Sequence, residues 1–154
     1  MAVRVQTADF NISAEMEQVA AGNTGIGGAA LFVGKVREHS GGERISSMTL
    51  EHYPGMTEAE LQRIEAEASG RFHLTASLIV HRVGTLLPGD NIVLVIACAA
   101  HRQEAFAAAE FLMDYLKTRA PFWKKEQLAN GASRWVEARD EDEDAAAVWQ
   151  TRES

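Results

Sequence analysis

Cysteine is almost absent from this sequence of 154 residues, which has a single one, Cys98. One cysteine excludes an intrachain disulfide and any metal cluster that needs several thiolates. Cys98 stands in the apolar run IVLVIACAA, a pattern typical of a buried strand, so we expect an inert core thiol, with a reactive thiol as the alternative. The five histidines show neither HxH nor HExxH spacing, so the sequence predicts no metal site.

Long hydrophobic runs are also missing. The longest, from Ile92 to Ala100, has nine residues, whereas a helix that crosses a bilayer needs about 20. The first ten residues, MAVRVQTADF, contain no hydrophobic signal core. These features predict a soluble protein of the cytoplasm.

Positive charge is scarce as well, because 15 lysines and arginines stand against 22 acidic residues, giving a net charge of −7. Such a balance disfavours a general nucleic-acid binder and a polybasic membrane-surface protein. The length and the 46% apolar content suit one domain, which we place at residues 1–139. Residues 140–154 begin with DEDED and are predicted to form a solvated acidic tail.

Alternating and helical patterns divide the chain into short elements. We expect strands near 3–5, 30–37, 48–53, 74–82 and 91–100, and helices at 13–22, 57–70 and 101–120. Two further extended stretches, around Trp123 and Trp135, are joined by a predicted hairpin loop. Because several strands follow one another without a helix between them, the fold class is α+β with an antiparallel or mixed sheet.

Four of the basic residues gather in the stretch KTRAPFWKKE, from Lys117 to Glu126. Lys117 falls in the last turn of the predicted helix, and Lys124 follows the break at Pro121, which can fold the chain back on itself. Two ammonium groups in one pocket would favour a neutral amine, able to act as a general base or a nucleophile. The alternative is a solvated group of cations that complements the helix dipole.

Two smaller basic clusters lie at the ends of other elements. His101 and Arg102 open a helix, where free N–H groups attract anions, and Lys35 and Arg37 end a strand. Each pair alone is compatible with a solvated surface. Together with Lys117 and Lys124, they suggest the hypothesis that three clusters converge on one anionic ligand.

Several of these motifs occur together in a known family. The phrases LFVGKVREHS, LEHYPGMTE, HRVGTLLPGD, AHRQEAF, MDYLKTRAPFWKKE and RWVEAR resemble the large, catalytic subunit of molybdopterin synthase. The resemblance extends from about Phe32 to Arg139, and the KTRAPFWKKE block with AHR is its most specific part.

The resemblance implies a sulfurtransferase that makes molybdopterin by inserting two sulfurs into cyclic pyranopterin monophosphate, in molybdenum cofactor biosynthesis. It implies a ubiquitin-like small subunit as sulfur donor, with a C-terminal Gly-Gly thiocarboxylate. It also implies a central dimer of large subunits within a heterotetramer. The implied fold is an α/β hammerhead with a small added β-subdomain, and no cofactor is implied.

The resemblance also assigns roles to residues at matching positions. Lys117 and Lys124 correspond to the catalytic lysines. The substrate-binding positions are Lys35, Val36, Arg37, His101, Arg102, Lys125, Glu126 and Arg139. Arg139 matches an arginine that reaches the neighbouring subunit's pocket.

Two other functions remain open from the residues. One is a non-catalytic subunit that docks a ubiquitin-like tail and uses its basic pocket only to hold a carboxylate. The other is a lysine Schiff-base enzyme with a free carbonyl substrate, which borohydride trapping would reveal.

Overall fold

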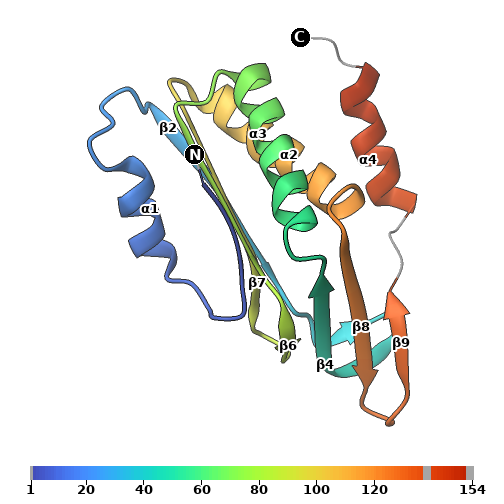
Figure 1. Cartoon of the computed structure of the whole chain (residues 1–154). Helices are drawn as coiled ribbons and strands as arrows, with labels where there is room; N and C mark the ends of the chain where they lie inside the picture. The colour runs from blue at the N-terminus through green and yellow to red at the C-terminus, as the bar shows by residue number, and fades with distance from the viewer. Residues whose placement is uncertain (1, 137–139, 152–154) are drawn as a thin grey trace.

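The computed structural model describes residues 2–136 and 140–151, with four helices and nine strands in the described part (Figure 1). The helices are α1 (Ile12–Ala20), α2 (Met56–Phe72), α3 (Arg102–Thr118) and α4 (Asp140–Thr151). The strands are β1 (Ala2–Gln6), β2 (Gly28–Lys35), β3 (His39–Ser40), β4 (Glu43–His52), β5 (Ala76–Arg82), β6 (Gly84–Leu86), β7 (Asn91–Ala99), β8 (Phe122–Leu128) and β9 (Ser133–Val136). No described helix is long and apolar enough to cross a bilayer.

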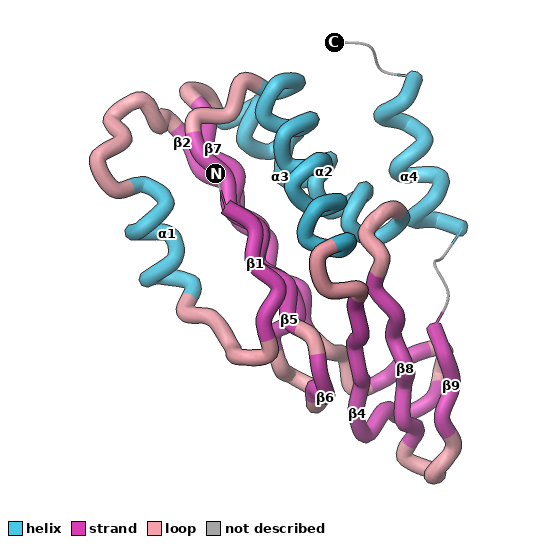
Figure 2. The backbone as a smooth tube through the Cα atoms, in the orientation of Figure 1, coloured by secondary structure: helices cyan, strands magenta, loops and turns pink. Residues whose placement is uncertain are grey.

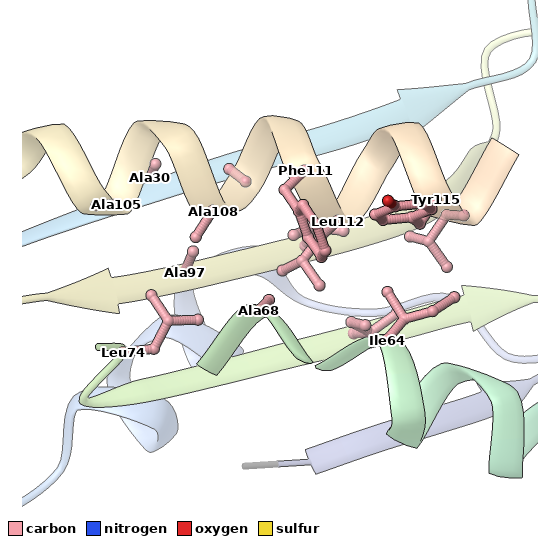
Figure 3. Close-up of a cluster of buried hydrophobic side chains, with 14 of the residues drawn as sticks. Ala30, Ile64, Ala68, Leu74, Ala97, Ala105, Ala108, Phe111, Leu112 and Tyr115 are labelled. Carbon is pink, nitrogen blue, oxygen red and sulfur yellow. The ribbon is translucent and has the colours of Figure 1, made fainter. Parts of the chain in front are cut away.

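The main sheet has the strand order β1-β5-β7-β2. β1 runs parallel to β5, and the other neighbours are antiparallel, so the sheet is mixed as the sequence predicts. In Figure 2, α2 and α3 cover one face and α1 lies on the other. Figure 3 shows the larger core, in which Ile64 and Ala68 of α2 meet Phe111 and Leu112 of α3 above the sheet.

The smaller sheet extends from one end of the main sheet and has the order β3-β4-β8-β9, with β6 also paired to β4. The β8–β9 hairpin confirms the two extended stretches predicted around Trp123 and Trp135. The short strand β6 lies where the sequence predicts only a turn. It follows β5 of the main sheet almost directly and pairs with β4 of the smaller sheet, so it connects the two sheets. Mixed and antiparallel sheets with this added β-unit are the α+β fold that was expected.

Two predicted helix ends are displaced. Asn11, and not Ser13, caps α1, because its side-chain oxygen accepts a hydrogen bond of 3.0 Å from the N–H of Ala14. Gly70 lies inside α2, which continues to Phe72 and ends with His73 in the left-handed conformation at a φ of 53°.

The predicted acidic tail is wrong for Asp140–Thr151, which form α4 and pack against α3. Ala146 and Trp149 are buried in the larger core, three residues apart on one side of the helix. The Trp149 indole N–H donates to Asp114 of α3 at 2.6 Å, and the Arg71 guanidinium donates to the carbonyl of Trp149 at 2.9 Å. The acidic run therefore occupies the start of a helix that is part of the fold.

Replacing Trp149 tests this correction. We expect Trp149→Ala to lower the free energy of unfolding by about 3–5 kcal/mol, because a large aromatic side chain and its hydrogen bond leave the core. Val148→Ala, at a side chain that is 44% exposed, should change it by less than about 0.5 kcal/mol. Urea unfolding of both variants gives the measurement. If both variants lost equally little unfolding free energy, the result would favour the solvated tail that the sequence predicts.

Candidate active site

Two adjoining cavities lie where the end of β2, the end of α3 and the start of β8 meet. Their volumes are about 430 and 360 Å³. They share seven lining residues: Lys35, Arg37, Ile92, Lys117, Ala120, Phe122 and Lys124. Four of these seven are cations, in a chain whose net charge is −7.

The turn after α3 explains how two of the cations meet. α3 ends at Thr118, and Pro121 prevents its continuation. The chain then reverses into β8, where Phe122 and Lys124 share the face that lines both cavities. Lys117 and Lys124 thus border the same space, which is the first of the two alternatives that the sequence left open for these lysines.

The other two cations, Lys35 and Arg37, lie at and just after the end of strand β2 of the main sheet. Lys35 ends β2, and its ammonium donates to the carbonyl of Gly89 at 3.3 Å. Arg37 follows two residues later and lines both cavities. The arrangement forms a positive site for an anion of small-molecule size.

The larger of the two cavities, of about 430 Å³, also contains carboxylates. Glu126 is 2% exposed and is held by Arg134, whose Nε lies 3.0 Å from the Glu126 carboxylate. Arg134 also donates to the carbonyl of Ser40 at 2.8 Å, so the ion pair links β8, β9 and β3. Asp142 of α4 lines the same cavity. Glu126 therefore has a fixed cationic partner of its own beside the lysines.

His81 is a site residue that the sequence did not single out. It lines the smaller cavity, is 7% exposed, and stacks on Phe122 with ring centroids 3.8 Å apart. Its Nδ1 lies 2.9 Å from the carbonyl of Arg82, which assigns the proton to Nδ1 and leaves Nε2 as an acceptor. Burial lowers the pKa of His81 to about 3, and the nearby positive charges of Lys124 and Lys117 contribute to this shift. The imidazole is therefore neutral at physiological pH.

This shift makes His81 a source of acid sensitivity. Its folded pKa of about 3 lies below the ordinary 6.5, so its contribution to stability is complete above pH 6.5 and is lost as the pH falls towards 3. We expect this residue to add a slope of about 1.4 kcal/mol per pH unit to the unfolding free energy over that range. Urea unfolding between pH 7 and pH 4 should show a flatter acid limb for His81→Asn. The same slope in both proteins would contradict a buried neutral imidazole.

Two residues that the resemblance assigns to substrate lie outside the cavity walls. Val36 is 2% exposed in the core between the sheets, and its N–H and carbonyl are both engaged, with Asp90 and Gly89. Lys125 points to the opposite face of β8 from Lys124, and its ammonium lies 5.7 Å from the centre of the Trp135 ring. Their substrate roles remain predictions.

The third basic cluster lies elsewhere. His101 and Arg102 begin α3 and line a separate hollow with Gln103 and Phe106. Arg102 is 15 residues from Lys117 on the same helix, a distance of roughly 22 Å at 1.5 Å per residue. Within one chain the structure thus brings two of the three predicted clusters together, and not the third. Arg139 lies outside the described residues.

Comparison with known proteins shows the family to which this chain is similar. The family model described as MoaE protein matches residues 5–119. The molybdopterin synthase catalytic subunit of Ralstonia nicotianae is 55% identical over 147 residues, which cover 96% of this chain and 83% of that protein. The solved molybdopterin biosynthesis MoaE protein of Burkholderia ambifaria is 52% identical, with a TM-score of 0.83, over 99% of this chain and 100% of its own.

A more distant solved structure shares the fold. It is a protein–protein complex of subunits 1 and 2 of molybdopterin-converting factor from Helicobacter pylori. It is 20% identical, with a TM-score of 0.70, over 90% of each chain. The match to the family model and the two close relatives show that this chain belongs to the MoaE protein family, the family of molybdopterin synthase catalytic subunits.

Proposed function

We propose that this chain is the catalytic subunit of a molybdopterin synthase and transfers sulfur to cyclic pyranopterin monophosphate. The observation that carries the proposal is the convergence of Lys35, Arg37, Lys117 and Lys124 on two adjoining cavities. The substrate has a phosphate, and the donor is a thiocarboxylate. Both are anions, which a positive site in an otherwise acidic protein attracts.

The proposed donor is a ubiquitin-like partner with a C-terminal Gly-Gly thiocarboxylate. The names of the relatives support this assembly, since the Ralstonia protein is called a catalytic subunit and the Helicobacter structure contains two subunits. The chain itself has one cysteine, which is fully buried, so the transferred sulfur has to come from elsewhere. That buried thiol also fits our proposal of a cytoplasmic location.

The proposed reaction begins when the thiocarboxylate sulfur attacks an electrophilic carbon of the pyranopterin side chain. A carbon–sulfur bond forms as a carbon–oxygen bond at the same carbon breaks, and the displaced oxygen takes up protons and leaves as water. The partner's C-terminus is then joined to the substrate as a thioester. Water then cleaves the acyl–sulfur bond, which leaves a carboxylate on the partner and sulfur on the substrate. A second donor tail supplies the second sulfur.

In this scheme Lys117 is the acid–base group and stabilises the charge that develops on the donor carbonyl. Lys35, Arg37 and Lys124 hold the anionic groups of the substrate. Glu126, bound to Arg134, fixes the β8 backbone beside Lys124. The apolar wall of the smaller cavity, including Phe32 and Met113, suits a flat heterocycle or an extended tail.

His101 and Arg102 enter the scheme through a second copy of the chain. They lie roughly 22 Å from Lys117 in their own chain, too far to hold the same small molecule. We therefore propose a central dimer in which each copy supplies this pair, together with Arg139, to the site of the other. One small donor subunit binds each end of the dimer.

Reconstitution tests the function. The chain is mixed with cyclic pyranopterin monophosphate and the small subunit in its thiocarboxylate form, and the dithiolene product is sought by mass spectrometry. The control is the same small subunit with an ordinary C-terminal carboxylate, which should give no product. A stable complex that makes no product would favour the binding-subunit alternative.

A further inference from the structure

His81 lines the smaller cavity, of about 360 Å³, and the proposed reaction gives it no role. It lies one residue before the end of β5, between β1 and β7. Its Nδ1 is bonded to the Arg82 carbonyl at 2.9 Å, and the Arg82 guanidinium is anchored in turn to the carbonyls of Thr7 and Asn91. The Phe122 ring stacks on the imidazole at an interplanar angle of 17°. The imidazole is therefore held along one edge and against one face.

The other ring nitrogen of His81, Nε2, has access to the cavity. Among the described residues, none makes a hydrogen bond with it. The buried side-chain atoms that lack a partner in the described part of the chain are Asn91 Oδ1 and Glu104 Oε2. Nε2 is not one of them, so it remains accessible although the residue is only 7% exposed. Because the smaller cavity is the open space beside His81, we infer that the Nε2 lone pair faces it.

The smaller cavity otherwise lacks side-chain acceptors among the described residues that line it. Four of these residues are cations, whose side chains can only donate hydrogen bonds. Apart from His81, the rest are apolar or glycine: Phe32, Val33, Gly34, Ile92, Val93, Met113, Leu116, Ala120 and Phe122. A bound molecule can place its anionic groups against the cations. Its N–H groups have one side-chain acceptor in this lining, Nε2 of His81.

The protonation state of His81 suits an acceptor better than a proton carrier. Its pKa of about 3 leaves Nε2 unprotonated at physiological pH, so the lone pair stays available. The same low pKa makes the imidazole a weak general base, because it takes up a proton poorly near neutral pH. Both the geometry and the charge state of the ring therefore favour a role in binding.

We propose that Nε2 of His81 accepts a hydrogen bond from an N–H group of the molecule in the smaller cavity and so orients that molecule towards Lys117 and Lys124. The proposal rests on the proposed function, which brings two molecules with N–H groups to this site. The pyranopterin has them on its ring system, and the small subunit has them in the amides of its Gly-Gly tail. In both molecules these groups lie outside the anionic part, so His81 recognises what the cations do not.

Two replacements separate the acceptor from the rest of the imidazole. His81→Asn keeps a side-chain N–H that can donate to the Arg82 carbonyl, but it has no atom at the position of Nε2. His81→Gln is one methylene longer, so its amide oxygen can reach that position. His73→Asn is the matched control. It makes the same change at an exposed residue that lines neither cavity and has a left-handed conformation, which asparagine tolerates.

Steady-state kinetics of the reconstituted reaction gives the first readout. In His81→Asn the KM for one of the two reactants should rise about tenfold, with kcat within about twofold of the wild-type value, because a hydrogen bond common to the bound state and the transition state is lost. The reactant whose KM rises is the source of the N–H group. His81→Gln should recover most of the loss, and His73→Asn should match the wild type.

A purely structural role gives a different pattern. It would lower the free energy of unfolding in both His81 variants without raising either KM, and His81→Gln would recover nothing. That pattern would overturn the proposal. A fall in kcat with both KM values unchanged would overturn it too, since the lost interaction would then belong to the transition state alone.

Nitrogen NMR of the unmutated chain gives a second readout that needs neither a variant nor turnover. The probes are cyclic pyranopterin monophosphate and the small subunit with an ordinary C-terminal carboxylate. Binding of one of them should move the His81 Nε2 signal upfield, as a new hydrogen bond to an unprotonated ring nitrogen does. If both probes shift the signals of Phe122 and leave Nε2 unmoved, the proposal is overturned. A wild type that binds both probes but makes no product in the reconstitution would reject the proposed function alone.

Discussion

Lys117→Ala should lower the rate of molybdopterin formation by about a thousandfold or more. The variant loses both the acid–base group and the stabilisation of the charge that develops on the donor carbonyl. The side chain is exposed at the end of α3, so the free energy of unfolding should change by less than about 0.5 kcal/mol. Single-turnover assays with the thiocarboxylated small subunit, followed by mass spectrometry, would measure the loss.

Arg119→Ala is the matched control. Arg119 is an exposed cation two residues further along, which stacks over Tyr115 at 4.1 Å and lines neither cavity. Its replacement removes the same charge from the same turn, so a rate near that of the wild type is expected. If the two variants lost activity equally, the effect would be one of overall charge and not of an acid–base group. Normal sulfur transfer by Lys117→Ala would reject the role.

The second large effect is complementation between two inactive variants. Lys117→Ala disables one half of each site, and the double change His101→Ala, Arg102→Ala disables the half that we assign to the other copy. Mixed dimers contain one intact site and one site with both defects. After statistical exchange, half of the dimers are mixed and half of their sites work, so activity should return to about a quarter of the wild-type value.

The contrast between the two geometries makes this result decisive. If His101 and Arg102 acted on the site of their own chain, every site would keep one defect and mixing would restore nothing. A mixture of Lys117→Ala with Lys124→Ala provides the control, since both residues lie on the cavities of one chain. That mixture should recover nothing, because every site in a mixed dimer keeps either the Lys117→Ala or the Lys124→Ala defect. If the test mixture, like the control, recovered nothing, the His–Arg pair would act on the site of its own chain.

Much of the fold follows from periodicity in the sequence. Alternation predicts the longer strands but neither β3 nor β6, and the break at Pro121 suggests the hypothesis that Lys117 and Lys124 share a pocket. The period of two in β8 also separates Lys125 from Lys124 and Glu126, a consequence that follows once the strand is known. The fixed rise of a helix, likewise, separates Arg102 from Lys117.

Other features depend on contacts that no local pattern contains. His81 is one residue in a β-rich run, and its importance arises from stacking on Phe122, which is 41 positions away. The acidic start of α4 predicts a solvated tail, whereas Ala146 and Trp149 further along the segment pack into the core. In both cases tertiary packing decides what local composition leaves open.

The burial of Cys98 affects which side reactions the transferred sulfur can undergo. Cys98 is fully buried in β7, and burial raises the pKa of its thiol, so it offers no reactive thiolate at the surface. An accessible thiolate near the donor could attack the thiocarboxylate carbonyl, which would form a thioester with the partner's C-terminus and release the sulfur as hydrosulfide. Cys98, the one cysteine of the chain, is too deeply buried to supply such a competing thiolate. Because the Cys98 thiol is buried, we also expect it to resist oxidation when the redox state of the surroundings changes.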